Sequence, residues 1–182
     1  RQLTANNVLE IQSEIVETIV RQLNVDLMPT DGQNTAIIPT EDLAAYTAYL
    51  TGKAKSDVES IESLHAAIAS FKEAIYLDPN FTLAYVALAD AYLRLSANFL
   101  GGLPGDESAA LAEPPLVRAL ALDESSPEAY ATLGLLRQVQ GNEEAAQQAF
   151  EKSIALNPEY PRAWRLYGRL RWQQSRLQEA MD

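Results

Sequence analysis

Residue types that carry out acid–base or metal chemistry are sparse in this chain. His65 is the sole histidine, and cysteine is absent. A single histidine, with no cysteine or carboxylate cluster at ligand spacing, favours a structural role over a metal ligand or general base. The lack of cysteine also excludes disulfides and thiolate zinc sites. The sequence therefore predicts no catalytic residue, no metal, no cofactor and no enzymatic activity.

Two further patterns also have plain explanations. The acidic pairs Glu143–Glu144 and Asp123–Glu124 are adjacent in sequence, so their side chains point in different directions on a helix. Both pairs fall at expected helix ends, where dipole and solvation roles are favoured over acid–base catalysis. The glycine-rich residues 101–105 lack the Gly-Lys-Ser/Thr ending of a phosphate loop, which favours a flexible connection.

Composition and charge point to an all-α protein with protein partners. The 182 residues are 47% hydrophobic and carry a net charge of −11. Such a charge argues against direct binding of nucleic acid or anionic lipid by this fragment. No apolar run reaches the roughly 18–20 residues that a membrane-spanning helix needs. The charge is uneven, because five arginines lie between Arg162 and Arg176.

A recurring order of large aromatic, Leu or Tyr, and Gly or Ala positions predicts a stack of helical hairpins. The spacing places these residues on one face of each helix, and the small residue allows close approach of a partner helix. One hairpin cannot bury its apolar face alone, whereas several stacked hairpins can. The order comprises Ala67, Phe71, Ala74 and Pro79; Tyr85, Leu88, Ala89 and Tyr92; Tyr130, Leu133, Gly134, Ala146, Phe150 and Pro158; and Trp164, Tyr167, Gly168 and Ala180.

This order, with a period of about 34 residues, resembles the tetratricopeptide repeat (TPR). The resemblance implies an all-α, right-handed superhelical solenoid of antiparallel helix pairs. We expect a TPR array over residues 41–182, with repeats at about 41–81, 82–126 and 127–160 and a partial repeat at 161–182. Upstream, we expect an amphipathic helix over residues 1–24, the end of a preceding domain, and a linker over residues 25–40.

Several departures from the repeat order lead to local expectations. We expect the first helix to begin after Thr40, and a polar stretch from Lys53 to Ser60 to separate it from the second. The stretch at residues 98–106 lies in the second repeat, which is about eleven residues longer than the repeat period. Pro114 and Pro115 predict a kink, or a helix that starts at Pro114. Trp164, Trp172 and most tyrosines are expected to pack in the core.

Two stretches resemble parts of larger bacterial regulators. Residues 8–23, VLEIQSEIVETIVRQL, are similar to the last helix of TolB-like domains. The following array resembles the TPR region of CadC-like transcription regulators and of some class III adenylate cyclases. The start at Arg1 and the stop at Asp182 inside a predicted helix indicate a fragment of a longer protein. A periplasmic location on a membrane-anchored protein is favoured, and a cytoplasmic one stays open.

The resemblance also suggests where a partner binds. In TPR proteins the second, fifth, ninth, twelfth and thirteenth positions of each first helix line the concave groove. Carried onto this sequence, these positions are Leu83, Val86, Asp90, Leu93 and Arg94; Glu128, Ala131, Leu135, Gln138 and Val139; and Arg162, Arg165, Arg169, Trp172 and Gln173. TPR pockets that clamp a C-terminal carboxylate use Lys and Asn at related positions, and those residues are missing here.

The groove candidates divide into an apolar floor and a basic stripe. The floor would be formed by Leu83, Val86, Leu135 and Val139, and the stripe by Arg162, Arg165 and Arg169. Arginine forks pair well with carboxylates, so a peptide or protein partner could be acidic. Alternatively, the stripe is a solvated face or packs on further repeats. An unpartnered N-terminal helix could also make a homodimer.

Three functions follow from these expectations. The first is a non-catalytic interaction or sensory module of a larger, membrane-associated bacterial transcription regulator. The second is a regulatory region of an adenylate cyclase or a similar signalling enzyme. The third is a structural spacer, for which changes in the groove would have no effect.

Overall fold

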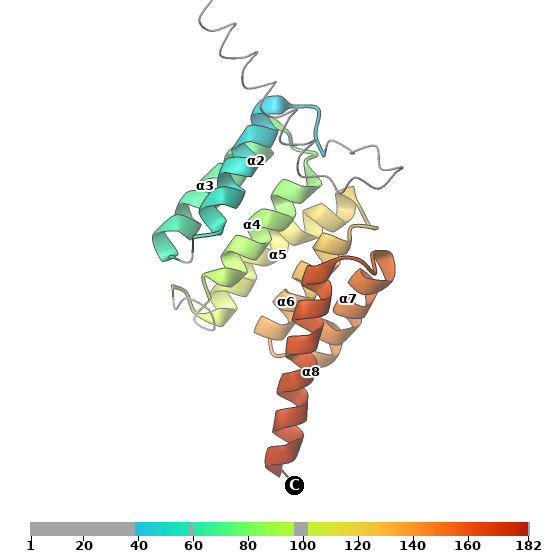
Figure 1. Cartoon of the computed structure of the whole chain (residues 1–182). Coiled ribbons are helices and arrows are strands. Elements are labelled where there is room, and N and C mark those ends of the chain that lie inside the picture. Colours follow the sequence, from blue (N-terminus) through green and yellow to red (C-terminus); the bar gives the residue numbers. More distant parts are fainter. Residues whose placement is uncertain (1–38, 59, 97–101, 182) are drawn as a thin grey trace, which may run out of the picture. The chain divides into compact units, whose positions relative to one another are not determined.

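The computed structural model describes residues 39–58, 60–96 and 102–181. These residues form helices joined by short connections (Figure 1). The helices are α2 (Leu43–Ser56), α3 (Ile61–Leu77), α4 (Thr82–Arg94), α5 (Gly105–Leu122), α6 (Pro127–Val139), α7 (Glu143–Leu156) and α8 (Pro161–Met181). Within these ranges, the β-structure is limited to an isolated bridge between Ser96 and Leu103. The all-α prediction is confirmed.

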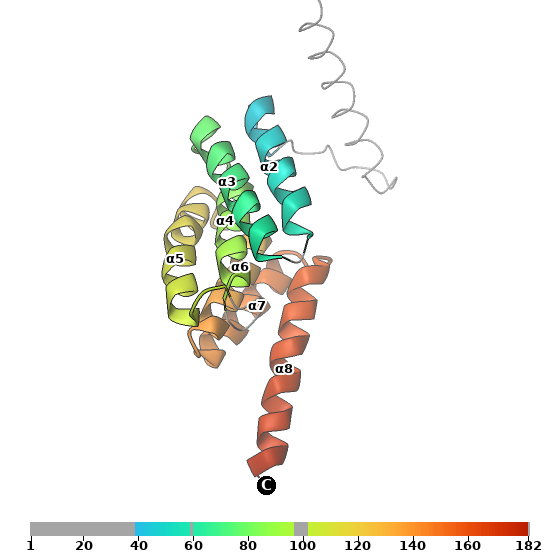
Figure 2. The same cartoon turned by 90° about the vertical axis from the view of Figure 1, so that its left-hand side faces the viewer.

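The helices pack as pairs in two layers. The strongest contacts are within α2–α3, α4–α5 and α6–α7, and α8 takes the position of a further first helix, in contact with α6 and α7. First helices also contact one another, α2 with α4, α4 with α6 and α6 with α8, whereas second helices contact first helices alone. The first helices thus form an inner layer and the second helices an outer one (Figure 2). This is the stacked-hairpin arrangement that the repeats predict.

Short polar side chains define the helix starts. The Asp42 carboxylate accepts from the Ala45 N–H at 2.9 Å, so α2 begins at Leu43. The helix was expected to begin after Thr40, and it begins two residues later because Asp42 caps it. Ser126 and Asn142 cap α6 and α7 in the same way. The caps satisfy N–H groups that have no partner within the helix.

A repeated side-chain turn ends each second helix. Asp78, Asp123 and Asn157 are the C-caps of α3, α5 and α7, and each accepts from the N–H two residues later at 2.9 Å. This Asx turn replaces a backbone turn and redirects the chain into the next pair. It explains why the second repeat tolerates Glu124 where the others have proline.

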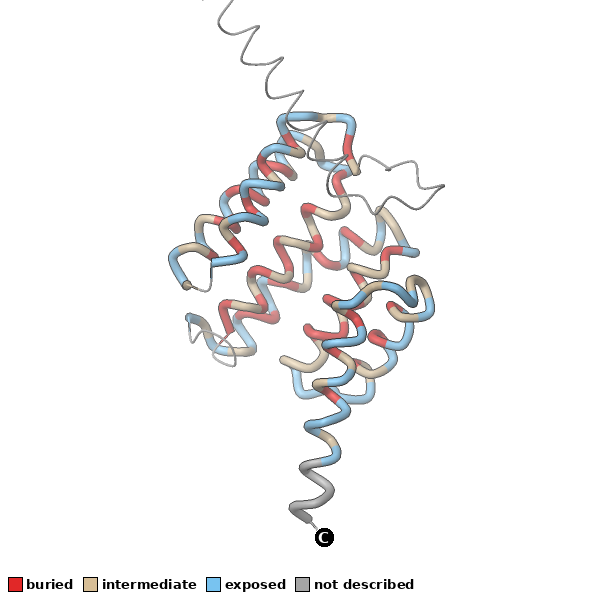
Figure 3. The backbone as a smooth tube through the Cα atoms, in the orientation of Figure 1, coloured by how far each residue is buried: buried red, intermediate tan, exposed pale blue. Residues whose placement is uncertain are grey.

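Glycine allows the two helices of a pair to approach closely. A Cβ built on Gly52 or Gly134 would lie within 3.0 Å of the ring of Phe71 or Phe150, respectively. Both rings are buried, with exposed fractions of 1% and 0%. Buried residues follow the facing sides of the helices (Figure 3). The small and aromatic positions of the repeat are therefore one packing unit.

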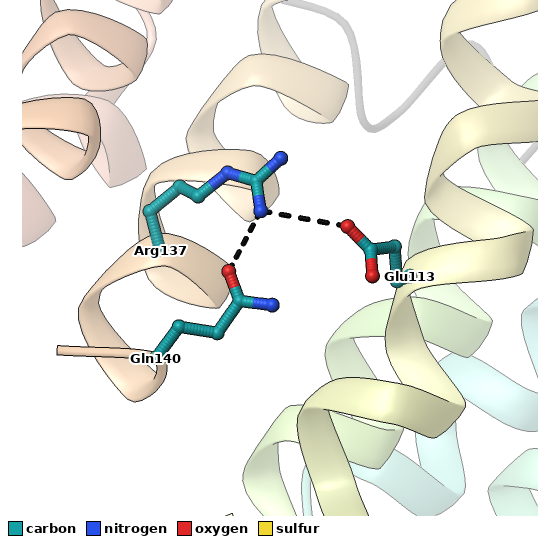
Figure 4. A network of polar contacts seen from close by, with 3 residues as sticks. All are labelled: Glu113, Arg137 and Gln140. Carbon is teal, nitrogen blue, oxygen red and sulfur yellow. Dashed lines mark hydrogen bonds and ion pairs between the residues drawn. The ribbon is translucent and has the colours of Figure 1, made fainter. Parts of the chain in front are cut away.

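Polar contacts also connect successive pairs at the surface. Arg137 on α6 donates to Glu113 on α5 at 3.4 Å and to Gln140 at 2.7 Å (Figure 4). The side chains of Arg137 and Glu113 are 34% and 45% exposed. An ion pair this exposed contributes at most about 1 kcal/mol. Apolar packing between the pairs therefore stabilises the stack more than this ion pair does.

Two local expectations were wrong. The first helix continues through Gly52 and Lys53 to Ser56, because Gly52 is needed opposite Phe71 inside the pair. Helix α5 begins at Gly105 and runs through Pro114 and Pro115, so the alternative of a helix that starts at Pro114 is wrong, whereas the alternative of a kink stays a prediction. Buried residues before and after the prolines belong to one core cluster, and their burial offsets the missing backbone hydrogen bonds.

Other predictions concern residues outside the described ranges. They are the helix expected over residues 1–24, the part of the expected linker at residues 25–38, and the part of the insertion at residues 98–101. These predictions stay as predictions.

A matched pair of glycine substitutions tests the packing unit. Gly134→Ala should lower the free energy of unfolding by about 1–3 kcal/mol, because the added methyl group overlaps a buried ring that has no free space. Gly168→Ala should raise it by about 0.5–1 kcal/mol, because nothing lies within 4 Å of the new Cβ and alanine favours helix. Urea denaturation followed by circular dichroism measures both. Equal effects at the two positions would contradict this account.

Candidate functional site

A pocket lies on the inner layer, and α2, α4, α6 and α8 all contribute residues to it. Its cavity volume is about 70 Å³. Its lining residues come from α2, α3, α4 and α6 and from the start of α8: Tyr49, Lys53, Ser56, Phe71, Leu83, Val86, Ala87, Asp90, Arg94, Glu128, Tyr160 and Arg162. We call this set the inner pocket. It joins residues up to 113 positions apart in sequence, from Tyr49 to Arg162.

Six of the fifteen groove candidates line the inner pocket: Leu83, Val86, Asp90, Arg94, Glu128 and Arg162. The four on α4 share one helical face, because residues three to four apart are neighbours on a helix. The other nine, which do not line the pocket, are Leu93, Ala131, Leu135, Gln138, Val139, Arg165, Arg169, Trp172 and Gln173.

The two remaining candidates for the apolar floor pack inside the protein. Leu135 is 2% exposed and belongs to the main core cluster. Val139 packs against the same cluster, and its side chain lies 3.6 Å from a Cβ built on Gly105 at the start of α5. The apolar floor of the pocket is therefore formed by Leu83, Val86 and Ala87 of α4 together with Phe71.

An ion pair between Arg162 and Asp90 spans the inner pocket. It connects α8 to α4, which are not neighbours in the stack because α6 lies between them. The side chains are 25% and 14% exposed. The Asp90 carboxylate is the main cause that raises the pKa of Arg162 above its ordinary value, and Tyr160 contributes through a hydrogen bond. Arg162 is thus already neutralised by the protein itself.

The rest of the arginine stripe has different surroundings. Arg169 donates to the Gln138 side chain at 3.2 Å, and Gln138 donates to Gln173 at 2.6 Å. Burial, together with the nearby Arg165 and Arg162, lowers the pKa of Arg169 below its ordinary value. Arg165 is exposed on α8. The three arginines are therefore close in space, but they differ in their polar partners and in their exposure.

Tyr49 and Lys53 of α2 are pocket residues that the repeat pattern did not predict. They lie one helical turn apart, so they face the same side. Tyr49 contacts the rings of Phe71 and Phe81, with centroids 6.0 and 5.0 Å away. The irregular spacing of the first repeat hides its groove positions. Counting from Gly52, the counterpart of Gly134, would have found both residues.

The expectation that Trp164 and Trp172 pack in the core was wrong. They are 51% and 61% exposed. The Trp164 indole N–H donates to the carbonyl oxygen of Pro158 at 2.7 Å, and the Tyr85 hydroxyl donates to the Pro79 carbonyl at 3.3 Å. The side chains of Trp164 and Tyr85 lie over the turn that precedes their own helix, and this position leaves them partly exposed.

The inner pocket is lined by groups that can bind a ligand. Across the described ranges, no three His, Cys, Asp or Glu side chains are grouped as metal ligands would be. His65 is exposed on α3 and does not line the inner pocket. No described helix is both long and apolar enough to cross a membrane. The pocket combines an apolar floor with cations and hydroxyl groups, which suits recognition of a peptide segment.

Burial of Tyr49 generates a pH-dependent prediction. Burial is the main cause that raises the pKa of Tyr49 from 10.0 to about 12, with smaller effects from Tyr46 and Glu128. The folded state therefore holds this proton more tightly than the unfolded state. The resulting stability is complete below pH 10 and is lost as the pH rises towards 12.

Tyr49→Phe should remove this dependence. Between about pH 9 and pH 11.5, wild type should lose about 2 kcal/mol more unfolding free energy than the variant. Urea titrations at the two pH values give the difference. Tyr76→Phe is the control, because Tyr76 is 85% exposed and should leave the pH dependence unchanged. An identical pH dependence in wild type and Tyr49→Phe would refute the assignment.

Comparisons with known proteins agree with this arrangement. The tetratricopeptide repeat family model matches residues 59–81 and 127–160. The transcriptional regulator HilA of Salmonella typhimurium is 25% identical over 124 residues, which are 65% of this chain and 22% of HilA. The chain thus spans about a fifth of the length of this relative.

Solved TPR structures have the same fold. The first TPR of Spaghetti (RPAP3), bound to the HSP90 peptide SRMEEVD, superposes with a TM-score of 0.57 at 21% identity, covering 76% of this chain and 98% of that one. The Sgt2 TPR domain from Aspergillus fumigatus gives 0.60 at 16% identity, covering 83% and 90%. MamA protein gives 0.52 at 28% identity, covering 75% and 67%. Together with the helix pairing, these matches show that the chain carries tetratricopeptide repeats and has the all-α TPR fold.

Proposed function

We propose that this chain is a non-catalytic protein-interaction module that holds a segment of a partner protein in the inner pocket. The observation that carries the proposal is the pocket itself, to which α2, α4, α6 and α8 all contribute residues. Its floor is apolar, and its walls carry Lys53, Arg94, Glu128 and the Asp90–Arg162 pair. Apolar contacts would supply affinity, and the charges would select the segment.

The solved relatives support peptide binding as the mode of recognition. The first TPR of Spaghetti (RPAP3) is bound to an HSP90 peptide, and the second TPR domain of the human RPAP3 protein is in complex with an HSP70 peptide. TPR folds are in general interaction scaffolds without catalytic activity. We therefore propose a peptide or protein partner for this chain, and the cations near the pocket favour one with acidic groups.

The larger protein would be a membrane-associated bacterial transcription regulator. The similarity to HilA supports a regulator, and the resemblance to CadC-like proteins agrees with it. Capture of a partner in the inner pocket would change the orientation or the oligomeric state of a linked domain. A DNA-binding activity would belong to other parts of such a protein, because this chain has a net charge of −11.

Charging the pocket floor tests this proposal. Leu83→Asp places a carboxylate among apolar side chains in the pocket, so partner binding should fall by about tenfold or more. Partners would be captured from an extract of the source organism, purified, and titrated by calorimetry against each variant.

Val117→Asp is the matched control for this experiment. Val117 lies on α5, outside the inner pocket, and is 61% exposed, so the same chemical change should leave affinity unaltered. Arg165→Glu/Arg169→Glu tests the arginine stripe in parallel. A partner that binds Leu83→Asp and the arginine variant as well as wild type would place recognition elsewhere. No specific partner at all would favour a structural spacer.

A further inference from the structure

The charges of the inner pocket are not equivalent. Asp90 and Arg162 neutralise each other across the pocket. The Glu128 carboxylate, in the first turn of α6, accepts from the Ser126 hydroxyl at 3.0 Å and has no ion pair among the described residues. Lys53 and Arg94 lie in the last turns of α2 and α4, and neither has an ion pair among the described residues. The pocket is therefore positive on the α2–α4 wall and negative towards α6.

A neutral donor adds to the positive wall. Tyr49 lies one turn before Lys53 and also lines the pocket. Its hydroxyl takes part in none of the hydrogen bonds between the described residues, so it can donate to a ligand in the pocket that Tyr49 lines. A carboxylate is the acceptor that best satisfies an ammonium, a guanidinium and a hydroxyl group together.

We propose that the inner pocket binds an acidic side chain of a partner segment through Lys53, Arg94 and the Tyr49 hydroxyl, and that Asp90 keeps Arg162 out of this contact. This inference rests on the proposed function and assigns its specificity. The flanking residues of the segment are apolar, because Leu83, Val86 and Ala87 form the floor beside these donors. The partner is therefore a segment that alternates acidic and apolar side chains.

The assignment changes the role expected for the arginine stripe. Free arginines on α8 would place the acidic group near Arg162. However, Arg162 already makes a partly buried ion pair, and removing it from Asp90 would leave a carboxylate unpaired. Arg162 is a structural connection between α4 and α8, whereas Arg94 and Lys53 select the ligand.

A labelled peptide tests the inference without knowledge of the natural partner. The probe is a fluorescent hexapeptide of alternating leucine and glutamate, with both ends capped. Binding to the whole chain is measured by fluorescence anisotropy at low and high salt. We expect affinity about tenfold or more above that of the same peptide with glutamine, falling as salt rises.

Matched variants separate the two sets of cations. Arg94→Gln and Lys53→Gln should each lower affinity by about tenfold. Arg118→Gln removes the same charge from an exposed position on α5, outside the pocket, and should leave affinity unchanged. The double variant Asp90→Asn/Arg162→Gln keeps the net charge and nearly the shape of the pocket, so it should lower affinity much less than Arg94→Gln does. Circular dichroism confirms that each variant is folded.

Several results would overturn the inference. One is a loss in Asp90→Asn/Arg162→Gln as large as that in Arg94→Gln, which would make Arg162 the ligand contact. Others are no measurable binding of the glutamate peptide, or equal binding of a glutamine peptide with a free C-terminus. A natural partner whose binding is abolished by Leu83→Asp but unchanged by Arg94→Gln and Lys53→Gln would contradict this inference alone and would leave the proposed function supported.

Discussion

Close approach of the two helices within a pair is the constraint on which this structure depends. Gly52 and Gly134 leave room for the buried rings of Phe71 and Phe150, and this contact fixes the distance between inner and outer layers. Each pair then presents an apolar surface to the next pair, so the stack buries a core that no single hairpin could form. The position of the inner pocket follows, because it is bounded by the first helices that these contacts hold in place.

Much of the fold could be predicted from the sequence because its packing is local and periodic. The order Tyr130, Gly134, Phe150 places small and aromatic residues on facing sides of two helices, and the structure shows that contact. Proline was a poorer guide. Helix α5 contains Pro114 and Pro115 because burial on both sides of them outweighs two missing hydrogen bonds, a balance that no local pattern reveals.

The pocket was less predictable than the fold, for reasons of geometry. The α4 candidates share one helical face, so Val86, Asp90 and Arg94 could be placed from spacing alone. The Asp90–Arg162 pair joins residues 72 apart, and its formation depends on how strongly the stack curves. Curvature is set by small rotations between pairs, which composition and period do not fix. Tyr49 was missed for a different reason, because its repeat has irregular spacing.

The bridge between α4 and α8 also bears on how this array unfolds. Repeat proteins are commonly treated as linear chains in which each unit is coupled to its immediate neighbours alone. A contact that skips α6 adds a coupling between the second and fourth units. Unfolding that starts at the C-terminal end must break this ion pair before it spreads. Unfolding of the second unit, in turn, removes the ion-pair partner of the fourth unit. The array should therefore melt more cooperatively than coupling between adjacent units alone would allow.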